Sequence, residues 1–592
     1  MKNNYRNKEN NSSVNKKNGY KQVNHRQKNN KPKIYKENYN GLRIIPLGGL
    51  EEVGRNMMAL EYKDDIIIVD MGLQFADEDM PGIDYIIPNT AYLKEKKEKI
   101  QGIIITHAHY DHIGAIPHSM ARLGNPTIYT APLTKNIIKK RQEDFPNTPK
   151  LNIEEINRKS QIKLGSFKIE FFHINHNIPD NLGLVINTPV GNVVHTSDFK
   201  FDHTPIADEP VDISRLNQIS KEGVLLLMSD STNAEKPGNS ISEKDIQDNL
   251  EQIFKISSGR IVVGTFSSLI SRIQEIINLA EKYNRKVAVD GYSMRTNLEI
   301  AKQMGYVKSE KGTIIKPEQI KKYPDNQVVL LCTGAQGESN AVLMRIANQE
   351  YKHLQVKRDD AVVFSSSIVP GSERAVQGLK DTFAQQGAEL YHYQMMDIHA
   401  GGHAQKEDLK MMINLMKPKF FMPIHGNYYM LNLHSKIAED ADIPSKNIVI
   451  GSNGQVILLN KDSIELTEEK VAANYVIVDG LGVGDVGEIV LRDRQALAQD
   501  GIFVIITAIN RKTGKVYGDP DIISRGFVYL RTSKELLDQT RQKVKKIISD
   551  SASSENKVNL SHVKEDIKEK IGQYLYNKTQ RQPMVLPVII KI

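Results

Sequence analysis

The sequence predicts a multidomain α/β protein. The chain has 592 residues, of which 40% are hydrophobic, and at about 100 to 200 residues per domain this length corresponds to about three or four domains. Short apolar runs separated by turn residues fill its first part, and helical and strand-like segments alternate from residue 242 onward. Such alternation is typical of a parallel sheet covered by helices.

The first folded region consists mainly of short strands. Its apolar runs are bounded by Gly-Gly, Lys-Asp-Asp and Asp-Met-Gly, which are turn signals. One helical pattern, at residues 113–123, interrupts the series. The predicted strands are residues 43–47, 57–62, 66–69, 103–105, 168–172, 183–187 and 193–196.

Helices alternate with strands in the next region, and a small α/β segment ends the chain. Between the two lies a Gly-rich stretch at residues 480–487, which is typical of a linker. The predicted helices are residues 246–254, 270–283, 533–549 and 564–577, and the predicted strands are residues 261–263, 286–289, 328–331, 361–364 and 502–507.

The composition excludes several classes of protein. The chain has one cysteine, Cys332, so an intramolecular disulfide cannot form and a secreted disulfide scaffold is excluded. No apolar run approaches the ~18 residues that span a bilayer. The N-terminus lacks the apolar segment of a signal peptide. We therefore expect a cytoplasmic protein without a membrane segment.

The net charge of +8 comes from one end of the chain. Residues 1–40 contain eleven Lys and Arg against two Glu, and twelve Asn. Because it has almost no aliphatic residues, this arm cannot bury enough surface to offset the entropy of ordering, and we expect it to be disordered. Two interpretations stay open: an electrostatic tether for RNA or another polyanion, and a solubilising tail without a specific role.

The most informative stretch is Thr106-His107-Ala108-His109-Tyr110-Asp111-His112. It follows a predicted strand, and a loop in that place can direct alternate side chains to one point. His107 and His109 can then bind one cation, and Asp111 and His112 a second one. Imidazoles combined with a carboxylate suit Zn²⁺ best, with Mn²⁺ as the alternative. A solvated His-rich loop is the competing interpretation.

Further candidate ligands also follow predicted strands. His176 comes after the strand at 168–172, Asp198 after the strand at 193–196, and His425 after the apolar run at 420–424. Each alone is typical of an ordinary polar loop residue. Together with the histidine-rich loop they recur where α/β and sandwich folds place their sites.

These residues carry a family resemblance. With Asp70, they resemble the ordered motifs of the metallo-β-lactamase superfamily, and Asp230, His403 and His425 resemble those of its β-CASP nucleic-acid-processing branch. Further strings make the chain, over residues 42–592, similar to the bacterial ribonuclease J family. These strings are residues 229–235, 334–338, 365–367, 402–403, 478–487 and 522–528.

The resemblance implies a metal-dependent ribonuclease with 5′-to-3′ exonuclease and endonuclease activity in RNA maturation and decay. It implies two Zn²⁺ per subunit, with Asp198 bridging them and Asp70 bracing the histidine loop without binding metal. In this assignment His403 is the general acid and Asp230 sets its tautomer, whereas a buried structural role is the alternative for His403. One metal would be held by His107, His109 and His176, and the other by Asp111, His112 and His425.

The resemblance also implies a pocket for a 5′-monophosphate. The chain departs from the family pattern at Gly401, where a serine is expected, at Tyr292, where basic residues are common, and near Ser271, where a histidine is expected. These departures affect how strongly the pocket binds a 5′-phosphate, and hence the ratio of exonuclease to endonuclease activity. The implied substrate-binding residues are His399, Ala400, Gly401, Gly402, His403, Ser365, Ser366 and Ser367.

The implied architecture is an αββα metallo-β-lactamase sandwich with an inserted β-CASP α/β domain and a small C-terminal α/β domain. The last domain implies assembly into a homodimer or homotetramer. Single-stranded 5′-monophosphorylated RNA and proteins of an RNA-degradation complex are the implied partners. We expect an arm at 1–41, the sandwich at 42–235 and 396–460, the β-CASP domain at 236–395, a linker at 461–487 and the assembly domain at 488–592.

The sequence leaves three alternatives to a ribonuclease. A β-CASP nuclease acting on DNA would differ in its contacts to the 2′-OH, which the sequence does not reveal. A small-molecule hydrolase is disfavoured by the long insertion between Asp230 and His399. A non-catalytic RNA-binding scaffold is disfavoured because every ligand position is filled.

Overall fold

The computed structural model describes residues 39–592, with the exception of residues 78, 207, 370, 481, 511–514, 529–532 and 553–559. The predicted basic arm therefore lies, up to residue 38, outside the described residues.

An eight-stranded sheet begins the fold, in the order β22-β21-β1-β2-β3-β6-β7-β8. Strands β1 to β3 pair antiparallel, and β3, β6, β7 and β8 pair parallel. Its strands are β1 (Leu42–Gly48), β2 (Met57–Tyr62), β3 (Asp65–Val69), β6 (Ile100–Ile104), β7 (Ile128–Thr130), β8 (Ile153–Glu155), β21 (Gln455–Leu459) and β22 (Ile464–Lys470).

A six-stranded sheet packs on the first, in the order β20-β13-β12-β11-β10-β9. The three strands at one side of this sheet, β12, β13 and the edge strand β20, are parallel neighbours. Because β20 comes from a much later part of the chain than β13, the sheet is completed only when the chain returns. Its strands are β9 (Gln161–Leu164), β10 (Phe167–His173), β11 (Leu182–Thr188), β12 (Gly191–His195), β13 (Leu226–Asp230) and β20 (Phe420–Ile424).

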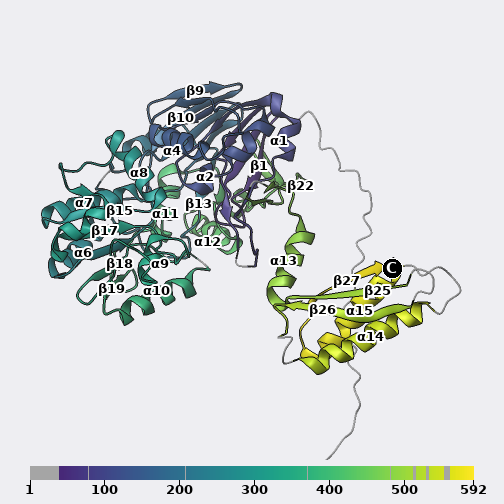
Figure 1. Cartoon of the computed structure of the whole chain (residues 1–592). Helices are drawn as coiled ribbons and strands as arrows, with labels where there is room; N and C mark the ends of the chain where they lie inside the picture. The colour runs from purple at the N-terminus through teal and green to yellow at the C-terminus, as the bar shows by residue number, and fades with distance from the viewer. Residues whose placement is uncertain are drawn as a thin grey trace, which may run out of the picture. The chain divides into compact units, whose positions relative to one another are not determined.

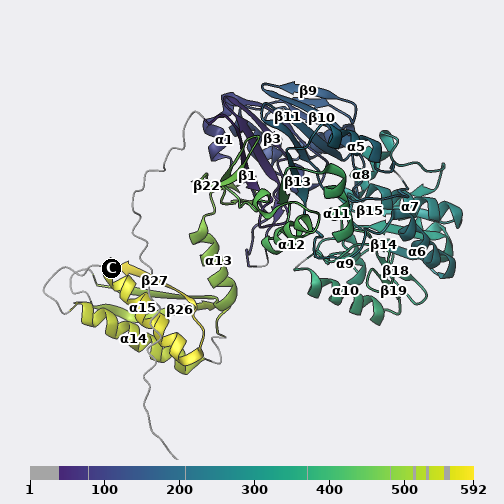
Figure 2. The ribbon, with the colours of Figure 1, turned by 180° about the vertical axis from the view of Figure 1, so that it is seen from behind.

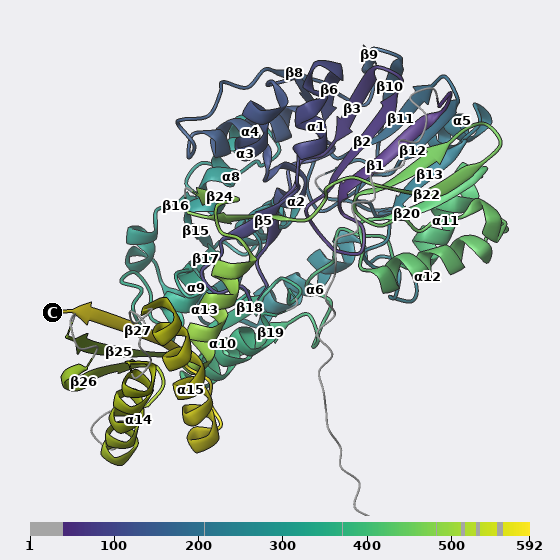
Figure 3. The same cartoon turned by 90° about the vertical axis from the view of Figure 1, so that its right-hand side faces the viewer.

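The two sheets enclose one apolar core. Ile44 and Leu60 of the first sheet and Ile169 and Leu184 of the second are fully buried in it. Helices cover both outer faces, α1, α3 and α4 on one side and α5, α11 and α12 on the other (Figure 3), which confirms the predicted αββα sandwich. These helices are α1 (Ala91–Glu95), α3 (Ile116–Ser119), α4 (Pro132–Gln142), α5 (Ile213–Lys221), α11 (Lys406–Met416) and α12 (Tyr428–Glu439).

A third sheet, which is fully parallel, lies between β13 and β20 in the chain, in the order β16-β15-β17-β14-β18-β19. Helices α6, α7 and α8 lie on one side of it, and α9 and α10 on the other (Figures 1 and 2). The predicted alternation is thereby confirmed. The elements are α6 (Glu243–Ile256), β14 (Ile261–Gly264), α7 (Ile270–Lys282), β15 (Lys286–Asp290), α8 (Tyr292–Gln303), β16 (Ile314–Ile315), β17 (Val328–Cys332), α9 (Val342–Ala347), β18 (Ala361–Phe364), α10 (Glu373–Gln385) and β19 (Glu389–His392).

The C-terminal segment is a small α/β unit. Strand β25 (Ile502–Ile509) pairs antiparallel with β26 (Val516–Arg525) and parallel with β27 (Met584–Lys591). Helices α14 (Lys534–Ala552) and α15 (Leu560–Thr579) pack on one face of this sheet. Alternate residues of β25 are buried under them, as a half-covered strand requires.

Two sequence predictions are wrong in part. The helix expected at 113–123 is three short pieces, α2 (Tyr110–Ile113), α3 and η2 (Met120–Leu123), because the amide of Ala115 donates to Met71 O instead of to its own helix. The expected linker at 461–487 contains β22, β23 (Val476–Asp479) and β24 (Gly482–Val483). Its edge strand β22 pairs with β21, and β23 pairs with β5 (Tyr85–Ile87).

Among the described helices, none is long and apolar enough to cross a membrane.

Candidate metal centre

Chemically active side chains gather where neighbouring strands end. The histidine-rich loop follows β6, and His176 follows β10. Asp198 follows β12, Asp230 ends β13 and His425 follows β20. Because β12, β13 and β20 are adjacent and parallel, their carboxyl ends lie at one edge of the sheet. The fold therefore brings together residues that are far apart in the sequence.

Three imidazoles form the first group. His109 Nδ1 lies 3.1 Å from His107 Nε2 and 3.0 Å from His176 Nε2. The other ring nitrogen of His176 donates to Gly402 O at 2.6 Å, which leaves Nε2 as the atom for a ligand. These three nitrogens could bind one metal ion.

A second group contains two carboxylates and two imidazoles. Asp111 Oδ2 lies 3.4 Å from His112 Nε2 and 3.5 Å from His425 Nε2. Asp198 completes the group, with Oδ2 3.1 Å from His112 Nε2 and Oδ1 2.8 Å from His425 Nδ1. The four ligand atoms lie within 4.8 Å of one another, so they too could bind a cation.

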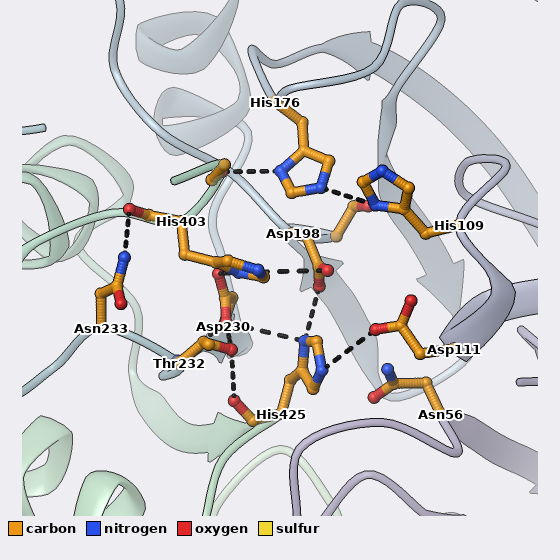
Figure 4. Close-up of polar contacts among 12 residues, drawn as sticks. Asn56, His109, Asp111, His176, Asp198, Asp230, Thr232, Asn233, His403 and His425 are labelled. Atoms are coloured by element: carbon orange, nitrogen blue, oxygen red, sulfur yellow. Dashed lines mark hydrogen bonds and ion pairs between the residues drawn. The ribbon is translucent and has the colours of Figure 1, made fainter. Parts of the chain in front are cut away.

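Asp198 lies between the two groups (Figure 4). Its Oδ2 is 3.8 Å from His107 Nε2 of the first group as well as close to His112 of the second. The structure thus brings all seven predicted ligands together, with one carboxylate next to both sets.

The protonation states of the first group favour metal binding, whereas in the second group the neighbouring carboxylates outweigh burial and raise the pKa of His112 and of His425. Burial lowers the pKa of His109 to about 4. Burial and the neighbouring imidazoles lower the pKa of His107 and of His176 well below the ordinary value, and neutral imidazole is the form that binds metals. Burial opposes ionisation of Asp198, but His425 and His112 hold the pKa of its carboxyl well below its usual range. Neutral imidazoles and ionised carboxylates are a donor set that fits Zn²⁺ or Mn²⁺.

Asp70 braces the histidine loop. Its Oδ1 accepts from Thr106 N at 2.9 Å, and its Oδ2 lies 2.8 Å from His112 Nδ1. This contact turns Nε2 of His112 toward Asp198, which is how an outer partner orients a metal-binding histidine. Asp70 belongs to neither group of ligand atoms.

The backbone around the centre is strained and crowded. Asp70, Ser197 and His425 have φ of 62°, 60° and 50°, a left-handed conformation that costs about 1–3 kcal/mol each and is concentrated at functional sites. Gly72 packs so closely that a Cβ there would lie 1.5 Å from Asp111 O. Any larger residue at position 72 would therefore displace the loop that carries Asp111.

His403 and Asp230 form a hydrogen-bonded pair beside the two ligand groups, and with Asp198 and His425 they are a third group that could hold a metal ion. Asp230 Oδ2 lies 2.8 Å from His403 Nδ1, and its Oδ1 accepts from Thr232 N at 3.0 Å (Figure 4). Burial lowers the pKa of His403, but the Asp230 and Asp198 carboxylates outweigh it and raise this pKa to about 9. The side chain of His403 is 20% exposed, against 1% for Asp230, so its imidazole is accessible to a substrate.

Of the implied phosphate-binding residues, Gly402 and His403 lie next to His176 of the first group. Gly402 touches His176 closely enough that a Cβ would lie 2.3 Å from His176 Cε1. Burial, with the charge of Arg272, lowers the pKa of His399 to about 3. Ser365 and Ser366 are buried, and their hydroxyls bond within the protein, the first to Ile398 O and the second to Gln336.

Sequence reasoning missed several contributors to the centre. Gly54 N donates to His425 Nε2 at 3.3 Å, and Asn56 Nδ2 lies 3.2 Å from His112 Nε2. Asn233 Nδ2 donates to His403 O at 3.0 Å. The first two lie on the β1–β2 connection, which has no motif of its own. Asn233 is part of the string 229–235, which was its only signal.

Comparison with known proteins identifies the family. Four family models match successive segments: "Beta-lactamase superfamily domain" at 44–214, "Ribonuclease J, beta-CASP domain" at 258–383, "Zn-dependent metallo-hydrolase RNA specificity domain" at 393–449 and "Ribonuclease J C-terminal domain" at 489–592. Ribonuclease J2 of Bacillus subtilis is 37% identical over 557 residues, which cover 94% of this chain and 100% of the relative. This chain belongs to the ribonuclease J family.

Other ribonuclease J relatives agree with this assignment. Ribonuclease J 1 of Streptococcus pyogenes is 38% identical over 93% of this chain and 98% of its own length, and Ribonuclease J 2 of Staphylococcus aureus is 37% identical over 94% and 100%. Family membership makes this chain a metal-dependent, hydrolytic ribonuclease. The alternatives of a DNA nuclease and a non-catalytic scaffold are not favoured.

Proposed function

We propose that this ribonuclease uses two divalent cations, preferably Zn²⁺, to degrade single-stranded RNA from a 5′-monophosphorylated end, with internal cleavage as a second activity. The observation that carries the proposal is the position of Asp198 between the two ligand groups. A carboxylate next to both groups could serve both cation sites, and a pair of cations stabilises the attacking and the leaving oxygen of a phosphodiester.

The first cation would be held by His107, His109 and His176, and the second by Asp111, His112 and His425. When bound, two such cations polarise the phosphodiester and supply a nucleophile at neutral pH. Asp198 would hold both, and Asp70 would keep His112 in the right tautomer and orientation.

His403 is the proposed general acid. Asp230 occupies its Nδ1, so Nε2 is the nitrogen that would donate a proton to the 3′ oxygen as it leaves. The raised pKa of His403, about 9, keeps that proton available at neutral pH. Asp230 acts through His403 by fixing its orientation.

Recognition of the 5′-phosphate is assigned to residues 399–403 with residues 365–367. The loop is attached to the first ligand group through Gly402 O, so a phosphate held there would be close to the cations. A Gly-rich turn can present backbone N–H groups to an anion, and Gly401 supplies no hydroxyl of its own.

The test compares one RNA sequence with a 5′-monophosphate, a 5′-triphosphate or a 5′-hydroxyl, beside a matched DNA. We expect mononucleotides to be released fastest from the monophosphorylated RNA, with the DNA left intact. Internal fragments that are independent of the 5′ group would instead show an endonuclease without a working phosphate pocket. Loss of the expected product after Asp111→Ala serves as the control for metal dependence.

We further propose that the C-terminal unit mediates assembly into a homodimer or homotetramer. The face of its sheet opposite α14 and α15 is aliphatic and uncovered in the single chain, with Leu586 47% and Ile590 48% exposed. Strand register places the neighbouring side chains on the same face. A contiguous apolar patch of this kind marks an interaction surface. The patch consists of Val504, Ile506, Ile523, Leu586, Val588 and Ile590.

Replacing Val588 with glutamate should dissociate the assembly, because a new charge in an apolar interface loses its hydration without gaining a partner. Light scattering after size exclusion would then give the mass of one chain, 66.8 kDa. Gln573→Glu on the exposed side of α15 adds the same charge away from the patch and should leave the mass unchanged. An oligomer that persists in Val588→Glu contradicts this interface.

A cytoplasmic location and partners from an RNA-degradation complex stay predictions.

A further inference from the structure

A buried arginine joins parts of the chain that flank the candidate site. Arg272, in the first turn of α7, is 2% exposed. Its guanidinium donates from Nε to Glu275 Oε2 at 2.8 Å and from Nη2 to Glu243 Oε2 at 2.9 Å. Its Nη1 donates to Ser365 Oγ at 2.6 Å and to Ile398 O at 2.7 Å. All three nitrogens are therefore used inside the protein.

The two bonds from Nη1 connect the two implied phosphate-binding segments. Ser365 is the first residue of the 365–367 segment, and Ile398 directly precedes His399. Ser365 Oγ also donates to Ile398 O at 2.7 Å. The hydroxyl of Ser365, the carbonyl of Ile398 and the guanidinium of Arg272 are therefore all hydrogen-bonded to one another. Arg272 thus fixes the separation of the two segments.

A chain of charges continues from Arg272 to the metal ligands. Glu243 Oε1 accepts from Lys200 Nζ at 2.9 Å. Lys200 lies two residues after Asp198, and its amide donates to Asn175 O at 2.8 Å, next to His176. The loops that carry Asp198 and His176 are therefore connected, through buried ion pairs, to Ser365 and Ile398.

Stability alone does not explain this cluster. Burying charges carries a large desolvation cost, and a well-packed apolar replacement is often at least as stable as a buried ion pair. Lys200, Glu243, Arg272 and Glu275 are all buried, and burial raises the pKa of Glu275 well above its ordinary value. What an arginine adds is five donors in a rigid, planar arrangement, which suits the holding of several groups in one geometry.

We propose that Arg272 is a positioning residue for recognition of the RNA 5′-phosphate. By holding Ser365 and Ile398 together, it sets residues 399–403 relative to the metal ligands. The inference rests on the proposed 5′-end recognition and names a residue that controls it without touching the substrate.

The test replaces Arg272 with lysine, which keeps the charge but loses the planar set of donors. We expect the ratio of kcat/KM for 5′-monophosphate RNA to that for 5′-hydroxyl RNA to fall at least about tenfold, since one or two charge-assisted hydrogen bonds are lost. The change should appear mainly in KM. Hydrolysis of bis(p-nitrophenyl) phosphate, which has no 5′-phosphate, should stay within about twofold of wild type.

The chain offers a matched control in Arg260→Lys. Arg260 is also buried, and it bonds to Asp360 through Nε at 3.0 Å and Nη2 at 2.5 Å. It precedes β14, at the end of the sheet away from Ser365, which follows β18. The control should lower thermal stability and leave the 5′-end ratio unchanged.

A wild-type ratio in Arg272→Lys, or an equal fall in Arg260→Lys, overturns the proposal. If Arg272→Lys does not fold, Glu243→Gln decides the question. It keeps the shape of Glu243 but removes its charge between Arg272 and Lys200, so it should also lower the ratio, and an unchanged ratio would refute the role. A wild-type enzyme that does not distinguish the two 5′ ends would instead refute the proposed function on which the inference rests.

Discussion

Replacement of Asp198 with alanine is expected to lower RNA hydrolysis at least about 10³-fold. The carboxylate lies next to both ligand groups, with His107 Nε2 at 3.8 Å and His112 Nε2 at 3.1 Å, so its loss weakens both cation sites at once. Metal polarisation of a phosphodiester contributes several kcal/mol, and each 1.36 kcal/mol is about tenfold in rate. The measurement is RNA cleavage beside metal content from elemental analysis.

A suitable control is Asp212→Ala. Asp212 accepts from Arg215 N at 3.0 Å and caps α5, so its loss should cost about 1 kcal/mol of stability and leave activity and metal content unchanged. Circular dichroism would show whether both variants are folded. A folded Asp198→Ala protein with wild-type cleavage would contradict the assignment of Asp198 to the metal centre.

Replacement of His403 with alanine is expected to lower RNA cleavage by about 10² to 10⁴-fold, the usual contribution of a general acid. The metal content should stay at the wild-type level, because His403 is assigned to protonation of the leaving oxygen. An RNA with sulfur in place of the scissile 3′ oxygen separates the two roles, since a thiolate leaves without being protonated. On that substrate the variant should regain most of the wild-type rate.

Asp230→Asn provides the companion variant. It keeps the shape beside His403 Nδ1 but removes the carboxylate charge that raises the pKa of His403. The lower pKa would leave less of the protonated imidazole at a given pH, so the loss of activity should grow as the pH rises. If His403→Ala is equally impaired on the oxygen and the sulfur substrates, His403 is not the general acid.

Much of the fold could be predicted because its signals are local. The alternation after residue 242 reflects helices that pack on both faces of a parallel sheet, so that strand β14 is buried along its whole length, Val263 included, as is Ile273 of α7. The histidine-rich loop was recognisable because its ligand types are adjacent in the sequence, and His176, Asp198 and His425 because each follows a strand. Strand ends are where such sheets place their sites.

The remaining features depend on long-range contacts, which leave no local pattern. The interruption of the helix at Ala115 arises from Met71, and the addition of β22 to the first sheet depends on β21. Gly54 and Asn56 reach the centre from the β1–β2 connection. In the sequence, Arg272 looks like an ordinary polar residue of an amphipathic helix. Only the structure shows that its side chain is buried and bonded to Glu243 and Ser365.

The most direct test of two-metal hydrolysis is a titration of the metal-free protein with Zn²⁺. Activity on 5′-monophosphorylated RNA and bound zinc would be measured at each step, beside a parallel series with Mn²⁺. We predict that activity rises to its plateau only when two cations are bound per chain, as the two ligand groups around Asp198 require. Full activity with a single bound cation, or without any, would contradict the two-metal mechanism.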